Sequence, residues 1–242
     1  MIVWFATGNI HKKEELADIL SGVKETALEI RIPKEAGLEF DPEETGTTFL
    51  ENALIKAEAL HRLLEEKRPS GYTSGDPVIA DDSGLCVDAL AGRPGIYSAR
   101  YCGPEMSPGA INHRGTQSNP GFSSVKLCGK KNITPPKLPD TDKNALLLAE
   151  LGDNPRRSAR FVCAMVLYYG SDRFFAAQET MEGELVPSAD AARGKGGFGY
   201  DPILYIPEMG RTVAELSEDE KNRMSHRGKA GRAITNILFG RS

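Results

Sequence analysis

The start of this chain combines a continuous apolar run, a segment with the helical spacing of apolar residues and a segment in which apolar and polar residues alternate. Residues 2–6 form a continuous apolar run that stops at Thr7-Gly8-Asn9, as a buried strand does before a tight turn. Residues 12–20 then carry leucine and isoleucine at helical spacing, and residues 27–32 alternate apolar and polar side chains. The pattern predicts a strand, a turn, a helix and a second strand.

The clearest helical pattern covers residues 47–67. Thr48 and Glu51 have the spacing of a capping box, and an apolar stripe of leucine and alanine follows at helical spacing. Asn52 and Lys56 are four residues apart, so they share a different face of the same helix. We therefore expect a helix that buries one face and presents Asn52 and Lys56 on another.

The rest of the chain predicts further strands and one more helix. Residues 77–80 suggest a strand, 81–84 a turn and 85–87 another strand; 159–184 suggest a long hairpin that turns at 170–172; and 226–238 suggest a final helix. The segment from Gly103 to Asp140 breaks the pattern, because it holds six of the 15 prolines and shows little periodicity. Such a stretch predicts a loop-rich excursion or an accessory element.

Composition narrows the class of protein. The 242 residues are 40% hydrophobic and 26% charged, with a formal net charge of −4, which is ordinary for a soluble domain. This balance argues against a general nucleic-acid or membrane binder. The first residues lack the features of a signal peptide, and no apolar run approaches the roughly 18 residues that span a bilayer. We expect a cytoplasmic protein.

The cysteines and histidines do not predict a zinc site. None of the four cysteines belongs to a C-x-x-C pair, and the four histidines are scattered. In a cytoplasmic chain we expect these thiols to be reduced.

The first candidate site is the turn formed by Thr7, Gly8, Asn9, Ile10, His11 and Lys12. A glycine turn that opens a helix offers free backbone N–H groups and the positive end of the helix dipole, and Lys12 adds a point charge. This combination suits a phosphate. The alternative is an ordinary turn in which Asn9 caps the helix.

Acidic residues form the second candidate site. Asp81 and Asp82 follow a predicted strand and precede Ser83, and Glu44 lies just before the long helix. Carboxylate oxygens are ligands that Mg²⁺ prefers, and the carboxyl ends of strands are where α/β proteins usually place their sites. The alternatives are a surface turn at 81–84 and a carboxylate that only complements the helix dipole at Glu44.

Two later segments could contact a nucleotide. In the segment Phe198, Gly199, Tyr200 and Asp201, glycines flank the aromatic residues and allow a ligand to approach closely. A flat base could therefore stack on Phe198 or Tyr200. Lys221 precedes a Ser-His-Arg-Gly run in which Arg227 offers fixed donors to a phosphate or a base carbonyl. The alternatives are a flexible connector in the first segment and a solvated helix end in the second.

The order and wording of these segments closely resemble the inosine/xanthosine triphosphate pyrophosphatase family. The resemblance rests on T-G-N-x-x-K, E-T-G-x-T-F-x-E-N-A, the block from Ala80 to Tyr101, G-F-G-Y-D-P-I and S-H-R-G-x-A, and it covers residues 1–102 and about 142–239. It implies an α/β fold in which helices flank a long twisted mixed sheet, in two lobes with the nucleotide in a cleft between them. It also implies one domain over residues 1–242 and a homodimer. The chain departs from the family at about 103–141, where members usually have a much shorter connection and this chain carries an extra loop-rich insertion.

The resemblance also implies roles for single residues. Residues Thr7 to Lys12 would wrap the phosphates, and Lys56 would add positive charge. Glu44, Asp82 and Asp81 would form the magnesium site, with Asp81 close beside the other two. Asp82 also matches the proton acceptor, so that it could be a metal ligand, the base or both. The base pocket would be lined by Phe198, Gly199, Tyr200 and Asp201, and His226 and Arg227 would reach the base. Ser83 and Lys221 are further expected substrate contacts.

The implied reaction is magnesium-dependent hydrolysis of ITP, dITP or XTP to the monophosphate and pyrophosphate. Two alternatives stay open: a related pyrophosphatase that acts on other modified triphosphates, and a nucleotide sensor without turnover. The expected partner is the small-molecule nucleotide, with neither nucleic acid nor a membrane.

Overall fold

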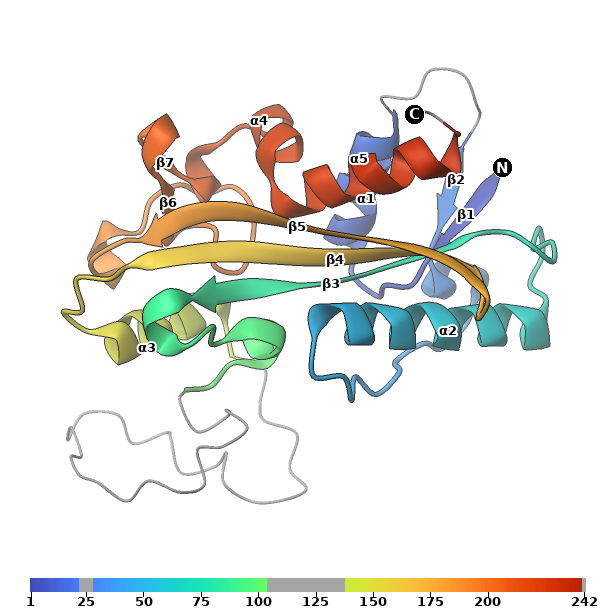
Figure 1. Ribbon diagram of the computed structural model, residues 1–242, viewed down its shortest axis with the longest axis horizontal. Coiled ribbons are helices and arrows are strands. Elements are labelled where there is room, and N and C mark those ends of the chain that lie inside the picture. The colour runs from blue at the N-terminus through green and yellow to red at the C-terminus, as the bar shows by residue number, and fades with distance from the viewer. Residues whose placement is uncertain (22–27, 104–137, 241–242) are drawn as a thin grey trace. The chain divides into compact units, whose positions relative to one another are not determined.

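The computed structural model describes residues 1–21, 28–103 and 138–240. Seven strands form one mixed sheet in the order β2-β1-β3-β4-β5-β6-β7 (Figure 1). Strand β1 pairs in parallel with β2 and β3, while β6 is antiparallel to β5 and β7. The predicted α/β class is confirmed. The elements are β1 (Ile2–Phe5), α1 (Ile10–Ser21), β2 (Glu29–Arg31), α2 (Phe49–Lys67), β3 (Val78–Val87), α3 (Asp140–Leu151), β4 (Ser158–Gly170), β5 (Arg173–Leu185), β6 (Leu204–Ile206), β7 (Arg211–Thr212), α4 (Glu218–Met224) and α5 (His226–Leu238).

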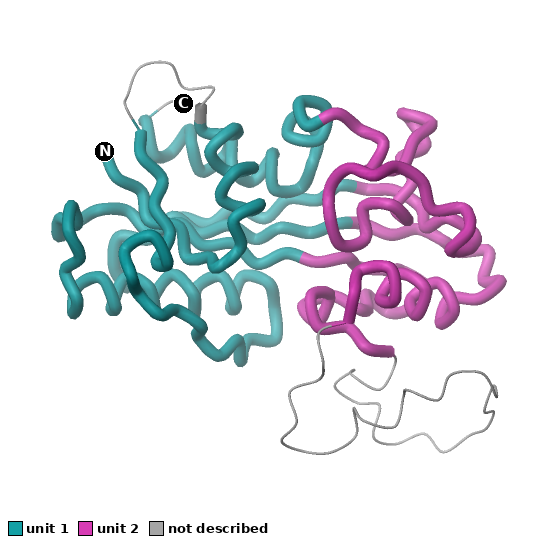
Figure 2. The backbone as a smooth tube through the Cα atoms, turned by 180° about the vertical axis from the view of Figure 1, so that it is seen from behind, with its two compact units in different colours: residues 1–83, 161–181, 218–242 teal, residues 84–160, 182–217 magenta. Residues whose placement is uncertain are grey.

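The chain divides into two compact units (Figure 2). Unit 1 holds residues 1–83, 161–181 and 218–242, and unit 2 holds 84–160 and 182–217. Strands β3, β4 and β5 each begin in one unit and end in the other. Most of the insertion expected at 103–141 lies outside the described residues, so its loop-rich character stays a prediction.

The core of unit 1 follows from the two-residue period of its strands. Val3, Phe5 and Ile79 point to one face of the sheet, where they pack with Leu16 of α1 and Ile234 of α5. The residues between them point to the other face and meet α2, whose stripe consists of Ala53, Ala57, Leu60 and Leu64. Helix α2 therefore covers one face of β1, β3 and β4, and α1 and α5 cover the opposite face (Figure 1).

Most predicted elements of unit 1 are confirmed. Helix α2 begins after Thr48, whose side chain accepts a hydrogen bond from the Glu51 backbone N–H in the expected capping box. Helix α5 covers 226–238 as predicted and is capped by Ser225, whose hydroxyl accepts from the Gly228 N–H. The first strand, the first helix and the long hairpin also lie where the pattern places them.

The turn predicted at 81–84 is wrong. Residues 78–87 form one continuous strand, β3, in which Asp81 and Asp82 are buried. Aspartate, serine and glycine favour turns only where their side chains can satisfy the local backbone. Here both carboxylates bond instead to side chains from distant elements, and that tertiary pairing overrides the local preference.

Unit 2 is built on the end of β3, the start of β4 and the end of β5, with α3, β6 and β7. Helix α3 buries Leu147, Leu148 and Leu151. Arg157, which precedes β4, donates to the backbone oxygens of Leu185 and Val186 at 2.8 and 2.6 Å, and so ties the end of β5 to the start of β4.

Two further expectations can be compared with the described residues. None of the helices described is long and apolar enough to cross a membrane. Cys86 and Cys163 are free thiols, as expected for a reduced chain, but Cys102 is disulfide-bonded. The expectation of reduced cysteines is therefore wrong for Cys102, whose partner lies outside the described residues.

Candidate functional site

Two adjacent carboxylates of β3 point to opposite faces of the sheet. Strand alternation places Asp81 on the face of Ile79, toward α1 and α5, and Asp82 on the face of Ala80, toward α2. Each carboxylate therefore has its own set of partners. The sequence analysis did not predict this separation, because it placed a turn at 81–84, and a turn does not fix the directions of the two side chains.

Asp82 belongs to a cluster with α2. The Asn52 amide donates to Asp82 Oδ2 at 3.2 Å, and Lys56 Nζ lies 3.0 Å from Asp82 Oδ1 and 3.0 Å from Glu44 Oε1. The four-residue spacing of Asn52 and Lys56 on α2 brings both to the same carboxylate, as their predicted shared face requires. One ammonium group thus serves two carboxylates, which leaves the cluster with net negative charge.

Burial and the charges of the neighbouring side chains shift the pKa values in the cluster. Burial raises the pKa of Asp82, the negative charge of Glu44 acts in the same direction, and the attraction of Lys56 does not reverse the shift. Burial alone would lower the pKa of Lys56, but the charges of Asp82, Asp81 and Glu44 outweigh it and raise that pKa. Lys56 therefore stays charged, while Asp82 is the more easily protonated of the two β3 acids.

Asp81 belongs to a second, more deeply buried cluster. Lys12 Nζ lies 3.0 Å from both carboxylate oxygens, and Arg227 donates from Nε and Nη2 to Asp81 Oδ2 at 3.2 Å. Burial would raise the pKa of Asp81, but the charges of Lys12, Arg227 and Lys56 outweigh it and hold the pKa well below its usual range. The Asp81 side chain is 1% exposed, against 11% for Asp82 and 27% for Glu44.

Arg227 connects this cluster to α1. Its guanidinium group donates to Ser83 Oγ at 3.0 Å and forms an ion pair with Glu15, whose second oxygen lies 3.1 Å from Lys221 Nζ. Burial opposes ionisation of Glu15, but Arg227 and Lys221 outweigh it and lower its pKa. Glu15 was not predicted as a site residue, because nothing in the sequence distinguishes it from the adjacent Glu14.

His226 is buried rather than presented at the surface. Its ring stacks on Phe161 at 4.9 Å between centroids, with 18° between the planes. Burial and the positive charge of Arg227 lower the pKa of His226 well below its ordinary value, so the imidazole is neutral. Among the described residues its Nδ1 has no hydrogen-bond partner.

The turn before α1 has the local geometry of a capped helix start. The Asn9 side chain accepts from the His11 N–H at 2.9 Å, and Thr7 Oγ1 accepts from the Asn9 N–H at 3.1 Å. Thr7 is buried, while Gly8, Asn9, Ile10 and His11 are exposed. The capping reading of Asn9 is confirmed, and the phosphate reading, which the capping geometry permits, stays a prediction.

In unit 2, the segment 198–201 separates its two aromatic rings. Phe198 is 36% exposed, whereas Tyr200 is 4% exposed and its hydroxyl donates to the backbone oxygen of Ser98 at 3.0 Å. Asp201 is also buried, and its Oδ2 accepts from the Phe198 N–H at 2.9 Å. Phe198 is therefore the ring that a flat ligand can reach, and Tyr200 and Asp201 support the loop.

Among the described residues, Glu44 and Asp82 could supply two of the ligands of a metal ion, with water and substrate supplying the others. No group of three or more His, Cys, Asp or Glu side chains in residues 1–21, 28–103 and 138–240 could hold an ion. Glu44 and Asp82 nevertheless converge on one ammonium group and keep some exposure. Two carboxylates with water and substrate oxygens are an ordinary ligand set for Mg²⁺.

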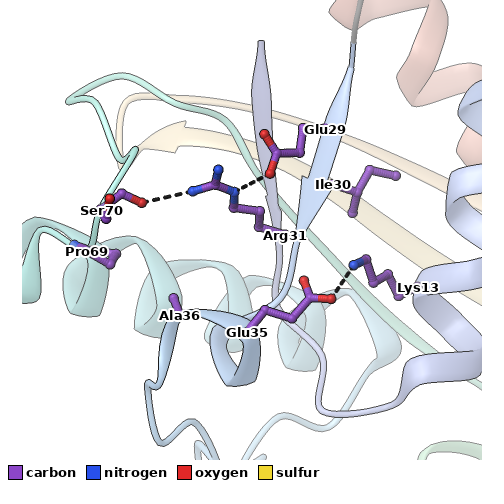
Figure 3. A pocket seen from close by; sticks show the side chains of 8 residues that line it. All are labelled: Lys13, Glu29, Ile30, Arg31, Glu35, Ala36, Pro69 and Ser70. Carbon is purple, nitrogen blue, oxygen red and sulfur yellow. Dashed lines mark hydrogen bonds and ion pairs between the residues drawn. The ribbon is translucent and has the colours of Figure 1, made fainter.

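A cavity of about 670 Å³ lies elsewhere in unit 1 (Figure 3). Its charged lining is internally paired: Arg31 donates to Glu29 and to the Ser70 carbonyl, and Lys13 pairs with Glu35. The lining residues are Lys13, Glu29, Ile30, Arg31, Glu35, Ala36, Pro69 and Ser70, and none of them is a predicted site residue. The chemistry described above is thus separate from this cavity.

Comparison with known proteins gives consistent matches. The Ham1 family matches residues 3–119 and 115–237. A dITP/XTP pyrophosphatase of Treponema denticola is 40% identical over 99% of this chain and 100% of its own length, and one of Thioalkalivibrio sulfidiphilus is 38% identical over 100% of both. Among solved structures, the Staphylococcus aureus Ham1 protein matches with a TM-score of 0.71 and 31% identity over 100% of both chains. A HAM1 protein from Coxiella burnetii gives 0.72 and 30% over 99% of both.

Proposed function

The chain belongs to the Ham1 family, and we propose that it hydrolyses dITP, ITP and XTP to the nucleoside monophosphate and pyrophosphate. The observation that carries this proposal is the pair of clusters around Asp81 and Asp82. They place three cations, Lys12, Lys56 and Arg227, beside carboxylates in one unit. Such a site suits a polyanionic substrate whose leaving group gains negative charge.

The Asp82 cluster is the proposed reaction centre. Glu44 and Asp82 would hold Mg²⁺, which supplies charge neutralisation and lowers the pKa of water when it is bound. Asp82 is the proposed proton acceptor by resemblance to the family, and its side chain, 11% exposed against 1% for Asp81, is the more accessible of the two β3 acids. Asn52 orients the carboxylate through its amide donor. Water would then attack the α-phosphorus on the side opposite the departing pyrophosphate.

The Asp81 cluster has a different proposed role. With a side chain that is 1% exposed, Asp81 is a poor candidate for direct metal ligation. Its carboxylate instead fixes the ammonium of Lys12 and the guanidinium of Arg227. We assign Lys12, together with the turn from Thr7 to His11, to the phosphates, since a fixed cation beside a helix start loses little entropy on binding.

The base is assigned to the segment 198–201. Phe198 would stack on the purine. Hypoxanthine and xanthine carry a 6-carbonyl, so a donor in the pocket would pair with them but would face another donor in adenine. An unpaired buried donor costs about 1–3 kcal/mol. His226, Lys221 and Ser83 are further proposed contacts by resemblance to the family.

The test is pyrophosphate release from dITP, ITP, XTP, dGTP and dATP with Mg²⁺, and again with EDTA. The proposal expects turnover of the first three, little turnover of dATP and loss of activity with EDTA. Tight binding without turnover would instead favour a nucleotide sensor, and preference for a modified pyrimidine would favour a related pyrophosphatase. The cytoplasm as location and a homodimer are further parts of the proposal; light scattering of the purified protein tests the dimer.

A further inference from the structure

Side chains from the start of α3 hold the backbone of Gly199 at both of its polar atoms. Asp140 Oδ2 accepts from the Gly199 N–H at 2.7 Å, and the Asn144 amide donates to the Gly199 oxygen at 3.1 Å. Gly199 has φ +66°, in the left-handed region that favours glycine. The two bonds therefore fix the peptide planes on both sides of Gly199, and one of these planes carries Phe198.

Lys143 reinforces this arrangement. Its buried ammonium group lies 2.7 Å from Asp140 Oδ1 and donates to the Ala99 oxygen at 3.4 Å. It also lies 6.0 Å from the centre of the Tyr200 ring, within range of a cation–π attraction. Lys143 thus orients the Asp140 carboxylate, and the ring next to Gly199 is held by the same side chain.

Within the described part of the chain, the buried Asn144 amide carries an unpaired acceptor, which lowers the stability of the fold. Asn144 is buried, and among the described residues its Oδ1 has no hydrogen-bond partner. An unpaired buried acceptor costs about 1–3 kcal/mol, so an apolar residue of similar size would serve packing better. The donation to Gly199 is the contact that an apolar side chain cannot replace, and it points to a role for the amide in shaping the loop.

We propose that Asp140 and Asn144 are positioning residues that set the affinity for the purine base by fixing the peptides around Gly199. The inference rests on the proposed function, because it takes the segment 198–201 as the base site. Loss of either bond lets the peptide planes rotate and moves Phe198 out of its stacking position. Base binding then weakens, while Asp81 keeps its contact with Lys12 and Asp82 its contact with Lys56, because these contacts involve neither Asp140 nor Asn144.

The experiment measures kcat and KM for dITP, with the inhibition constant of inorganic pyrophosphate as a readout that is blind to the base. The variants are Asp140→Ala, Asp140→Asn, Asn144→Ala and Asn144→Asp. We expect Asp140→Ala to raise KM about tenfold or more, the usual effect of losing a charge-assisted bond, and Asn144→Ala, which loses a neutral bond, to raise it about two- to tenfold, both with little change in kcat. The inhibition constant of pyrophosphate should not change. Asp140→Asn keeps an acceptor oxygen and should recover part of the loss.

Asp142→Ala is the matched control. Asp142 lies in the same first turn of α3 and contributes a similar charge to the helix start, but it is exposed, and its side chain accepts from Thr141. It should leave KM unchanged. The proposal is overturned if Asp140→Ala and Asp142→Ala behave alike, or if the constant for pyrophosphate rises together with KM.

The wild-type chain separates this inference from the proposed function. If it turns over none of the purine triphosphates, the proposed function fails, and the same variants are compared by calorimetric binding of dIMP. Weaker binding in Asp140→Ala than in Asp142→Ala would still support the positioning role. Equal binding, or no binding of dIMP to the wild-type chain, would overturn it.

Discussion

Lys56 Nζ lies 3.0 Å from Glu44 Oε1 and 3.0 Å from Asp82 Oδ1, so one ammonium group holds two carboxylates that come from separate segments. Its removal would take away the ammonium group that lies 3.0 Å from the buried Asp82 carboxylate. A buried charge that loses its partner destabilises a protein by about 3–5 kcal/mol. The stability of unit 1 therefore depends on the same cluster that we propose as the reaction centre.

Asp82→Asn should remove most of the turnover. The amide is nearly the same size and can still contact Lys56, but it cannot accept a proton. We expect kcat for dITP to fall by at least about 10²-fold, the usual effect of a positioned acid–base group. Calorimetric titration with dITP should show that the variant still binds nucleotide. Near-normal turnover would contradict the assignment of Asp82.

Arg227→Ala should lower activity toward all purine triphosphates by similar factors. The resemblance to the family suggested that Arg227 reaches the base, but its guanidinium group pairs with Asp81, Ser83 and Glu15. Its loss would disturb the Asp81 cluster, which does not distinguish between bases. The measurement is kcat/KM for dITP and dATP in the variant and in the wild type.

Arg232→Ala is the control for that experiment, because Arg232 is exposed on the same helix and donates to backbone oxygens of α4. It should have little effect on either substrate. A selective loss on dITP in Arg227→Ala would instead make Arg227 a base contact.

Glu15→Gln should destabilise the protein at neutral pH and much less in acid. The folded-state pKa of Glu15 is below its ordinary value of 4.5, so its ionised form stabilises the fold above that value. The contribution is lost as the pH falls through the folded-state pKa. A lost charged hydrogen bond of about 1.5–3 kcal/mol corresponds to several degrees in Tm for a chain of this size.

Thermal melts from pH 7 down to well below pH 4.5, the ordinary pKa of the carboxyl group, test this dependence. Glu14→Gln is the matched control, since Glu14 is the adjacent residue, is 65% exposed and pairs with His11 at 3.4 Å. We expect the difference in Tm between Glu15→Gln and the wild type to shrink toward low pH. A difference that does not depend on pH would show that the ion pairs of Glu15 do not stabilise the fold.

Replacement of residues 106–136 by a short Gly/Ser linker should leave an active enzyme. Loop-closure entropy changes by only about 0.6 kcal/mol per doubling of length. The linker variant should carry Cys102→Ser so that no unpaired thiol is left, and kcat for dITP should stay within about tenfold of the wild type. An inactive but folded variant, or a change in oligomeric state, would contradict the prediction.

A longer deletion that also removes Asp140 should behave differently. Residues on both sides of this segment support the loop at Gly199 and Tyr200. Before it, the Ser98 oxygen accepts from the Tyr200 hydroxyl, and the Ala99 oxygen accepts from Lys143. After it, Asp140 and Asn144 bond to the backbone of Gly199. We expect the longer deletion to raise KM for dITP beyond the shorter one. Equal KM values in the two deletions would mean that these flanking contacts do not affect base binding.

The sequence allowed a good prediction wherever the information was local. The start of α2 at Thr48, the extent of α5 and the shared face of Asn52 and Lys56 all depend on residues within a few positions of one another. The α/β class was an expectation from the resemblance to the family, and the mixed sheet with its helices confirms it.

The missing parts depend on contacts between distant residues. Asp81 meets Lys12 across 69 positions and Arg227 across 146, and no local pattern encodes that pairing. For the same reason the Asp-Asp-Ser-Gly segment was predicted as a turn, although the partners of its carboxylates stabilise a strand. The roles of Glu15 and Asn144 also become visible only when the elements are packed.

The opposite orientation of the two β3 acids makes this strand sensitive to insertions as well as to substitutions. One extra residue between Val78 and Asp81 would reverse which side each later side chain points to, because the period of a strand is two. Asp81 would then face Lys56, and Asp82 would face Lys12 and Arg227. A single inserted codon would therefore exchange the partners of Asp81 and Asp82, although neither residue is substituted.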